Sequence, residues 1–400
     1  MGSNNIERLN IGIFGRRNVG KSSLINALTL QDIAIVSPIP GTTRDPVQKS
    51  MEIHSLGPCV IWDTAGLDDP TELGEIVKRK TEKVIESTDI ALLVLDIEQG
   101  WGKYEEDIVE ELERRKIPFI TVINKIDLNG SNNNLREVLT SKNIDFSEVS
   151  ALRKIGIDEL REKISKKAKE IRSVTKLLEG IVKEDDLVIL VVSIDPETPV
   201  GRIKLPQVQA IRECLDTHAY TLVVRDSELE KALSSLSKKP AIVVTDSQLF
   251  ERVKSLVPED VMLTSFSILY ARYKGDLKTF VEGIDALKKL KDGDRVLIAE
   301  SCTHHPIEDD VATVKIPKIL RKISQNIGIE YSHGRDFPED IEKFKVIIHC
   351  GGCMITRREV LSRIGKAKEK GVPVTNYGMI FAMDSGILER ALEPFKYQLI

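Results

Sequence analysis

Gly15-Arg16-Arg17-Asn18-Val19-Gly20-Lys21-Ser22 lies between a short apolar segment, residues 10–14, and a helical pattern over residues 21–28. The glycines allow the backbone to turn so that several N–H groups face the inside of the loop, and the helix that follows adds the positive end of its dipole. A loop of this kind between a strand and a helix binds nucleotide phosphates. The spacing predicts that Lys21 reaches the β- and γ-phosphates and that Ser22 ligates magnesium.

The segments around this loop predict a doubly wound α/β sheet. Four of them are short, rich in Ile and Val and nearly continuous in apolar character, which is typical of strands buried on both faces of a parallel sheet. Helical patterns separate them. The strand candidates are 10–14, 60–63, 90–96 and 119–124, and the helix candidates include 21–28, 72–86, 105–116 and 158–172.

Two further series of strands and helices follow. Their strand candidates are 187–193, 221–224 and 241–244, and then 296–299, 346–349 and 374–375. A chain of 400 residues is also too long for one ordinary core. We therefore expect an α/β protein of three consecutive α/β domains, at 1–174, 175–268 and 269–400, of which the first is a doubly wound phosphate-loop sheet.

Composition excludes several classes of protein. The formal net charge of −4 gives no electrostatic reason to expect a nucleic-acid binder, and no apolar run reaches the length of a membrane span. The first ten residues show no signal-peptide pattern, so a cytoplasmic protein is expected. Five cysteines at uneven spacing are not a disulfide framework, and Cys59 and Cys214, in apolar contexts, are expected to be core thiols.

Three later motifs resemble those of the translation-factor-like GTPases. Asp63-Thr-Ala-Gly66 would hold magnesium through water and sense the γ-phosphate, Asn124-Lys-Ile-Asp127 offers a carboxylate for the two N–H groups on one edge of guanine, and Ser150-Ala-Leu152 resembles the third loop beside the base. The resemblance predicts a GTP-binding set: Gly15, Asn18, Val19, Gly20, Lys21, Ser22, Ser23, Asp63, Gly66, Asn124, Lys125, Asp127, Ser150 and Ala151.

The segment Gly41-Thr-Thr-Arg-Asp45 matches the first switch of these GTPases, so Thr43, with Thr42 as the second choice, is expected to be the other magnesium ligand. Leu67 follows Gly66 where Ras-like enzymes carry a water-orienting Gln. Asn18 resembles the residue of a subgroup that uses potassium to stabilise charge, although an amide there also suits a loop. We expect Lys21, Thr43 and Asn18 to serve slow, potassium-stimulated GTP hydrolysis.

Three of the cysteines form a second constellation. Cys302-Thr-His304 and His349-Cys350-Gly-Gly-Cys353 each follow a predicted strand. Because the carboxyl ends of parallel strands open on one edge of a sheet, these two segments are expected to meet there. Three thiolates suit an iron–sulfur cluster with one iron left open, and three Cys with one His suit zinc equally well. The spacing leaves both metals open, as well as no metal.

The two constellations together resemble the HydF family of [FeFe]-hydrogenase maturation GTPases, and the stretch 198–209 is similar to the central domain of that family. The resemblance covers essentially the whole chain. It implies GTPase, dimerisation and cluster-binding domains, and a [4Fe-4S] cluster on Cys302, Cys350 and Cys353, with His304 and His349 as further candidate ligands. It also implies a homodimeric scaffold that receives a diiron precursor from two radical-SAM maturases, HydE-like and HydG-like, and passes it to apo-[FeFe]-hydrogenase.

Two alternatives belong to other classes. A ribosome- or tRNA-associated GTPase with a structural zinc site would share the nucleotide motifs, but the C-terminal half shows neither a Gly-x-x-Gly clamp among basic residues nor an aromatic RNA platform. A redox enzyme that transfers electrons through its cluster would be better served by a fully ligated cluster than by three cysteines.

Overall fold

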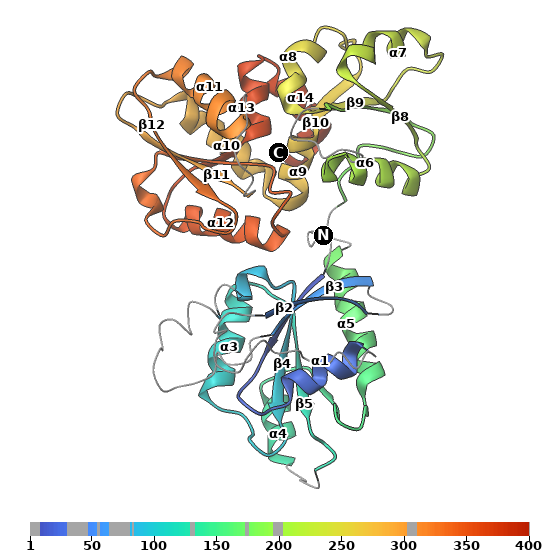
Figure 1. The fold of residues 1–400 in the computed structure, drawn as a ribbon, viewed down its shortest axis with the longest axis vertical. Helices are drawn as coiled ribbons and strands as arrows, with labels where there is room; N and C mark the ends of the chain where they lie inside the picture. The colour runs from blue at the N-terminus through green and yellow to red at the C-terminus, as the bar shows by residue number, and fades with distance from the viewer. Residues whose placement is uncertain are drawn as a thin grey trace. The chain divides into compact units, whose positions relative to one another are not determined.

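The computed structural model of the chain describes residues 9–29, 47–53, 57–63, 81, 84–128, 133–172, 176–194, 203–301 and 310–399. The chain divides into two compact units, Met1–Val174 and Thr175–Ile400. Together they hold three sheets, each covered by helices, which confirms the predicted class of three consecutive α/β domains (Figure 1). The predicted boundary between residues 268 and 269 stays a prediction.

The first unit is built on a six-stranded sheet of order β2-β3-β1-β4-β5-β6, in which β2 runs antiparallel to β3 and the other pairs are parallel. Its strands are β1 (Leu9–Phe14), β2 (Val47–Ile53), β3 (Gly57–Asp63), β4 (Ile90–Asp96), β5 (Phe119–Asn124) and β6 (Phe146–Glu148). Its helices are α1 (Lys21–Thr29), α3 (Lys103–Arg114), α4 (Asn133–Ser141) and α5 (Ile157–Arg172).

Both faces of this sheet are covered, which explains the unbroken apolar runs of its central strands. Along β4, Leu92 and Val94 belong to the core beneath α1 and α5, whereas Leu93 and Leu95 belong to the core beneath α3 and α4. All seven residues of β4 are buried. Alternate side chains therefore enter opposite cores.

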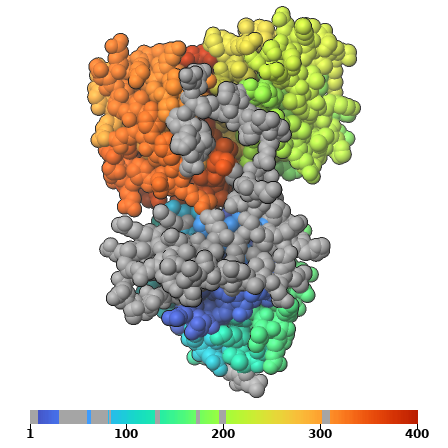
Figure 2. Space-filling view, viewed as in Figure 1, coloured from blue at the N-terminus to red at the C-terminus, as the bar shows by residue number. Residues whose placement is uncertain are grey.

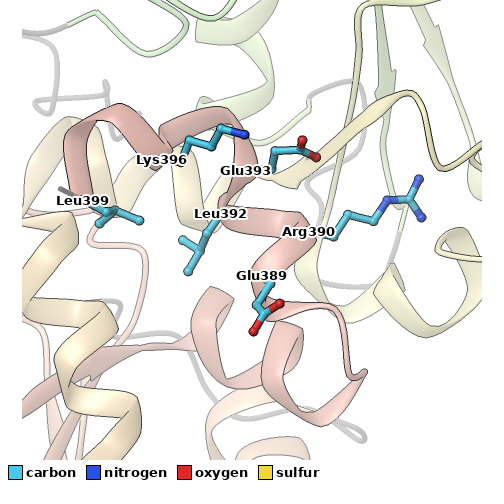
Figure 3. Close-up of a pocket in the computed structure, with 6 residues that line it drawn as sticks. All are labelled: Glu389, Arg390, Leu392, Glu393, Lys396 and Leu399. Atoms are coloured by element: carbon cyan, nitrogen blue, oxygen red, sulfur yellow. The ribbon is translucent and has the colours of Figure 1, made fainter.

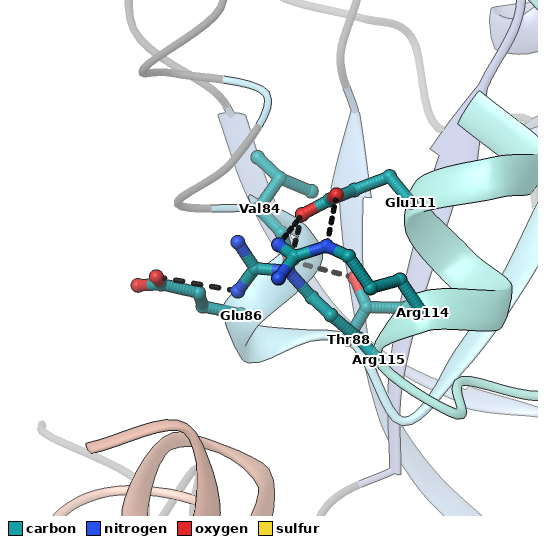
Figure 4. A network of polar contacts seen from close by, with 6 residues as sticks. All are labelled: Val84, Glu86, Thr88, Glu111, Arg114 and Arg115. Atoms are coloured by element: carbon teal, nitrogen blue, oxygen red, sulfur yellow. Dashed lines mark hydrogen bonds and ion pairs between the residues drawn. The ribbon is translucent and has the colours of Figure 1, made fainter. Parts of the chain in front are cut away.

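An ion pair between Arg115 and Glu86, supported by pairs to Glu111 within α3, joins the C-terminal end of α3 to the short helical segment 84–87 that precedes β4 (Figure 4). The guanidinium of Arg115 contacts Glu86 at 3.3 Å and Glu111 at 2.5 Å, and Arg114 pairs with the same Glu111 at 2.7 Å. Thr88 ends the segment by donating its hydroxyl to the Val84 carbonyl. These contacts fix the entry into β4 against the C-terminal end of α3.

The second unit holds two parallel four-stranded sheets, of order β10-β9-β7-β8 and β12-β11-β13-β14. The strands are β7 (Leu187–Val191), β8 (Tyr220–Val224), β9 (Ile242–Thr245), β10 (Met262–Ser265), β11 (Arg295–Glu300), β12 (Gly328–His333), β13 (Val346–His349) and β14 (Val374–Asn376). The helices are α6 (Leu205–Asp216), α7 (Leu229–Ser235), α8 (Phe250–Val253), α9 (Phe266–Lys274), α10 (Leu277–Lys288), α11 (Ile316–Ile323), α12 (Arg357–Glu369), α13 (Tyr377–Asp384), α14 (Leu388–Leu392) and α15 (Lys396–Leu399).

One hydrophobic core runs through both sheets of the second unit. The α9 and α13 helices pack on each other between the sheets, and the Thr264 hydroxyl of β10 donates to the Ala391 carbonyl of α14. In Figure 2, the segment that forms the sheet of β7 to β10 is yellow-green and the segment that forms the sheet of β11 to β14 is orange. Residues outside the described ranges are grey. The cysteine-bearing sheet and the sheet before it therefore form one packed body.

Each sheet changes its direction of winding next to its first strand. In the last sheet, the chain passes from β11 through α11 to β12 on one side and then returns to β13 on the other, so α11 and α12 lie on opposite faces (Figure 1). Open α/β sheets bind ligands at this reversal, outside the carboxyl ends of the two strands. The reversals lie between β1 and β4 in the first sheet and between β11 and β13 in the last.

The differences from the predicted elements are mostly short strands. The β2, β6, β10 and β12 strands were not predicted. These strands lie at sheet edges. In β6 and β12, partial exposure permits polar residues and weakens the apolar signal, whereas β10 is largely buried but has only four residues. The helix predicted over 72–86 falls largely outside the described residues. No helix in the described ranges is long and apolar enough to cross a membrane.

Candidate functional site

The phosphate loop connects β1 to α1, which agrees with the strand and the helix predicted on either side of it, and it lies at the reversal point of the first sheet. Gly15 has φ +148°, and a Cβ there would lie 2.3 Å from the Val94 carbonyl oxygen of β4. Gly20 has φ +92°, and a Cβ there would lie 2.3 Å from the Asn124 amide nitrogen. Both positions therefore require glycine, because of the backbone conformation and because of the space.

Lys21 is buried at the start of α1, and its ammonium lies inside the loop. It donates to the carbonyl oxygens of Gly15 at 2.5 Å and Arg16 at 2.9 Å. Ser22 is half-buried and Ser23 exposed. Arg16 is paired with the buried Glu105 of α3, which also accepts from the Gly102 N–H at 2.9 Å. Glu105 of α3 thus holds the phosphate loop in place through Arg16. The sequence of the loop itself does not indicate this contact.

The loops that follow β5 and β6 meet the phosphate loop through Asn124. Its amide nitrogen donates to the Val19 carbonyl at 2.9 Å, and its amide oxygen accepts from the Ala151 N–H at 3.0 Å. Asn124 is 2% exposed. The structure therefore gives it a bridging position between two of the predicted nucleotide-binding segments.

Asp127 is oriented by a hydrogen bond from a hydroxyl group, and Lys125 is oriented by an ion pair. The Ser150 hydroxyl donates to Asp127 at 2.5 Å, and this hydrogen bond lowers the pKa of the carboxyl group. Lys125 has φ +64° and pairs with Asp96 at the end of β4, with 2.8 Å between Nζ and Oδ2. A carboxylate with a depressed pKa suits recognition of two N–H donors on one base edge.

Several predicted residues cannot be placed. Thr42, Thr43, Gly66, Leu67, Cys302 and His304 lie outside the described residues, and Asp63 is described only as the last residue of β3. Asn18 is exposed in the loop with φ +64°, a left-handed conformation that Asn tolerates better than most residues. Their roles stay predictions.

The cysteine loop lies at the reversal point between β11 and β13. The Cys350 N–H donates to the Ala299 carbonyl of β11 at 3.0 Å, which extends the pairing of the two strands by one residue. The Cys350 sulfur accepts from the N–H groups of Ser301 at 3.1 Å and Gly352 at 3.3 Å, and its S–H donates to the Ser301 hydroxyl at 3.2 Å. Ser301, the residue before Cys302 in the sequence, therefore contacts the Cys350 sulfur through both its N–H and its hydroxyl.

The donors around Cys350 fit a thiolate that binds metal. Burial and the neighbouring Cys353 raise the pKa of the Cys350 thiol, whereas the hydrogen bonds from Ser301 and Gly352 oppose that rise. Backbone N–H groups directed at sulfur are a feature of iron–sulfur sites, where they stabilise the anionic ligand. Cys353 is half-buried in the same loop. Within the described ranges no three His, Cys, Asp or Glu side chains gather as a metal site, and Cys302 and His304 are outside those ranges.

His349 is buried beside the cysteine loop with both ring nitrogens engaged. Nδ1 lies 2.7 Å from the Cys350 carbonyl, to which only an N–H can donate, so Nε2 accepts from the Arg363 guanidinium at 3.3 Å. Arg363 also donates to the Gly334 carbonyl at 2.6 Å. Burial, reinforced by the charges of Arg363 and Lys274, lowers the pKa of His349 to about 3. The imidazole is therefore neutral and serves as a link between the loop and α12.

A separate hollow of about 560 Å³ lies among the C-terminal helices (Figure 3). It is lined by Glu389, Arg390, Leu392, Glu393, Lys396 and Leu399, none of which belongs to a predicted site. Arg390 reaches away from it and donates to the carbonyls of Lys254, Val257 and Pro258. We assign this hollow to the attachment of α14 to the preceding sheet rather than to ligand binding.

The residues that sequence reasoning missed are those that support the two sites from a distance. Glu105 supports the phosphate loop, and Ser301, Lys274 and Arg363 surround the cysteine loop. Glu105 and Lys274 are 89 and 78 positions along the chain from the residues they contact, whereas Arg363 is 14 positions from His349 and Ser301 is next to Cys302. No local motif marks them, so a single sequence carries no signal for them.

Comparison with known proteins assigns a family to each part of the chain. Residues 278–394 match the family model for the hydrogen maturase F tetramerization domain, and residues 177–275 match the model for its dimerization domain. Residues 10–125 match the 50S ribosome-binding GTPase model, and residues 78–184 match the elongation factor Tu GTP-binding domain.

Similar curated proteins resemble only the first part. The tRNA modification GTPase MnmE of Desulforamulus reducens is 38% identical over 160 residues, which are 40% of this chain and 34% of that protein. MnmE of Moorella thermoacetica is 39% identical over 162 residues, again 40% of this chain and 34% of the relative. The chain thus spans about a third of the length of these relatives.

Among solved structures, a variant of Aquifex aeolicus Era bound to GDP·AlF4− is 22% identical, with a TM-score of 0.34, over 62% of this chain and 97% of that one. The G domain of the T. maritima iron transporter FeoB is 23% identical, with a TM-score of 0.30, over 40% of this chain and 99% of that one. The family models cover both units and include two that are specific to one family. The chain therefore belongs to the hydrogen maturase F family, with a GTPase domain ahead of that family's dimerization and tetramerization domains.

Proposed function

We propose that this protein is a GTP-hydrolysing scaffold or carrier that assembles the diiron subcluster of [FeFe]-hydrogenase and transfers it to the apo-enzyme. The observation that carries the proposal is the Cys350 sulfur, which receives two backbone N–H groups at a sheet reversal where Cys302 follows directly after Ser301. Family membership supports the hydrogenase assignment, and the ordered phosphate loop supports nucleotide turnover.

In the first unit, Lys21 would bind the β- and γ-phosphates while Ser22 and Thr43 bind Mg²⁺. Asp127, oriented by Ser150, would accept two N–H groups of guanine. Leu67 cannot orient the attacking water as the Gln of Ras-like enzymes does. Asn18 would therefore bind a K⁺ ion at the phosphate loop, which stabilises the charge that develops during hydrolysis. Hydrolysis is then slow, and it is faster in potassium than in sodium salts. Equal rates of GTP hydrolysis in KCl and NaCl would remove the potassium role while leaving the GTPase assignment intact.

In the second unit, Cys302, Cys350 and Cys353 would hold a [4Fe-4S] cluster. A cluster held by three thiolates has one iron open to a bridging ligand of the diiron cargo, such as cyanide. The N–H groups of Ser301 and Gly352 stabilise the Cys350 thiolate. His349 orients the loop, because iron binding would require it to give up Arg363 or the Cys350 carbonyl. His304 stays a candidate ligand.

The partners of this function are two radical-SAM maturases, HydE-like and HydG-like, and apo-[FeFe]-hydrogenase, all in the cytoplasm. The protein acts as a homodimer, and the family model of residues 177–275 supports oligomerisation. GTP hydrolysis gates partner exchange, since loss of the γ-phosphate changes the shape of switch segments. It supplies no electrons to the cluster.

The test is reconstitution with the two maturases under anaerobic conditions, followed by transfer to apo-hydrogenase. An iron–sulfur cluster makes the reconstituted protein brown. Serine at Cys302, Cys350 or Cys353 should abolish this brown colour and hydrogenase activation while GTP hydrolysis continues. Lys21→Ala should keep the colour and abolish hydrolysis. Hydrogenase activation that proceeds equally well without this protein rules out the scaffold role, and a colourless protein that retains zinc favours a structural metal instead.

A further inference from the structure

Lys274, the last residue of α9, is a buried cation directed at the cysteine loop. It is 3% exposed, and its ammonium donates to the carbonyl oxygens of Gly352 at 2.9 Å and Ile355 at 2.8 Å. The Cys353 carbonyl lies 3.5 Å away, and the ring of Tyr270 lies 5.3 Å from the ammonium. Lys274 belongs to the segment that matches the dimerization model, whereas the loop belongs to the segment that matches the tetramerization model.

Lys274 contacts carbonyl groups of the Cys350–Ile355 loop, and the Cys350 sulfur contacts an N–H group of the same loop. Gly352 donates its N–H to the Cys350 sulfur while its carbonyl accepts from Lys274. Its φ of +66° allows this arrangement, and a Cβ there would press on Val360 at 3.0 Å. An ammonium that draws the carbonyls to one side leaves the opposite side of the loop to N–H groups and sulfur. Lys274 therefore sets the direction in which the loop presents its donors.

The charge of Lys274 also suits the chemistry of the loop. Three thiolates bring more negative charge than an oxidised four-iron core brings positive charge, so a cluster site of this kind is anionic. A buried ammonium interacts strongly with such a site because little water screens it. The field of Lys274 already reaches the neighbouring His349, whose protonated form it disfavours.

We propose that Lys274 is the positioning residue of the Cys350–Ile355 loop and the buried counter-cation of its thiolate site. The cluster site is then built across two family segments, because its loop is shaped by the end of α9. The counter-cation half of this inference rests on the proposed cluster function. The positioning half rests on the loop geometry alone.

Lys274→Met and Lys274→Gln separate the two halves. Met keeps the apolar stem and removes both the charge and the donors, whereas Gln keeps two N–H donors without the charge. The matched control is Lys368→Met, which removes an exposed lysine that pairs with Asp276 at 2.8 Å between α12 and the start of α10. All variants are made in the full chain, and thermal unfolding checks that each one folds.

The first measurement is amide hydrogen exchange of residues 350–356 in the metal-free protein. Lys274→Met should accelerate exchange in this loop by about tenfold, and Lys368→Met should leave it unchanged. If the loop exchanges alike in wild type, Lys274→Met and Lys368→Met, the positioning role is wrong. If Lys274→Met does not fold, the same comparison is made with Lys274→Gln, for which about threefold acceleration is expected.

The second measurement follows reconstitution with iron and sulfide. Lys274→Met should retain less than about half of the wild-type iron. In Lys274→Gln, the ratio of oxidised to reduced cluster at a fixed dithionite potential should rise about tenfold, which is a shift of about 59 mV to more negative potential for one electron. An unchanged potential in Lys274→Gln overturns the counter-cation role. A wild-type protein that takes up no iron instead contradicts the proposed function, and with it the counter-cation role, while the exchange result still decides the positioning role.

Discussion

The imidazole of His349 illustrates how a single side chain couples the cysteine loop to stability. Its folded pKa is about 3, below the ordinary value of 6.5, because the ring is buried next to the cations of Arg363 and Lys274. Between those two pH values the unfolded chain binds a proton that the folded chain excludes. The sign of the linkage is therefore that stability falls as the pH falls below about 6.5.

For the metal-free protein we expect His349 to contribute a loss of about 2 kcal/mol between pH 7.5 and pH 5. His349→Gln offers an amide that can accept from Arg363 and donate to the Cys350 carbonyl, but it cannot titrate. Scanning calorimetry of both proteins at the two pH values measures the difference. If wild type and His349→Gln lose the same stability on acidification, the imidazole is not the group responsible.

Residues that carry a motif could be predicted, and residues that support one from afar could not. Gly15, Gly20 and Lys21 lie where their spacing predicts, because the loop between strand and helix is a local structure. Glu105 and Lys274 act across 89 and 78 positions of sequence respectively. Their contacts form only when the helices pack against the rest of the unit. The residues next to them in the sequence do not indicate this packing.

Among the elements, β8 has the features of an interface. It pairs with β7 on one side, and no strand in the described ranges pairs with its other side. Tyr220 is 59% exposed and Val223 41% exposed on this strand, and Leu215 at the end of α6 is 63% exposed. An apolar edge strand is an opportunity for pairing with a second chain. The dimerization model covers all three residues, so we predict that a second copy of this chain covers the edge.

Val223→Lys should convert the proposed dimer to a monomer, because it places a charge in the pairing edge without disturbing the core of the unit. Light scattering after gel filtration gives the mass directly. Val314→Lys is the control, since Val314 is 43% exposed in the segment matching the other family model. A dimer that survives Val223→Lys with unchanged mass and affinity excludes this edge.

At the same scale, buried central strands were the best predicted elements. The predicted bounds of β4, β5 and β13 agree with the structure at every residue, because strands covered on both faces are nearly continuous in apolar character. The edge strands β6 and β12 are largely half-exposed and mix polar with apolar residues. That mixture resembles a loop when it is seen without its neighbours, so these two strands could not be distinguished from loops.

The whole molecule consists of two units with separate cores. The described core residues of Met1–Val174 form two clusters on either side of one sheet, and those of Thr175–Ile400 form one cluster of their own. Because no core cluster of the described residues spans the two units, each unit should unfold cooperatively by itself. Calorimetry of the metal-free protein should therefore show two transitions.

GDP with Mg²⁺ should raise the temperature of only one of these transitions. At about 100 times Kd a ligand stabilises its unit by about 2.7 kcal/mol, which is a shift of roughly 5–11 °C for a unit of this size. Lys21→Ala should abolish the shift, since its ammonium lies inside the loop that is predicted to bind the phosphates. A second transition that moves with GDP as far as the first would show that nucleotide binding reaches the cysteine-bearing unit in the isolated protein. If instead only the transition of the GTPase unit moves, the nucleotide state has to be communicated through partners that contact both units. A gate for partner exchange requires this arrangement.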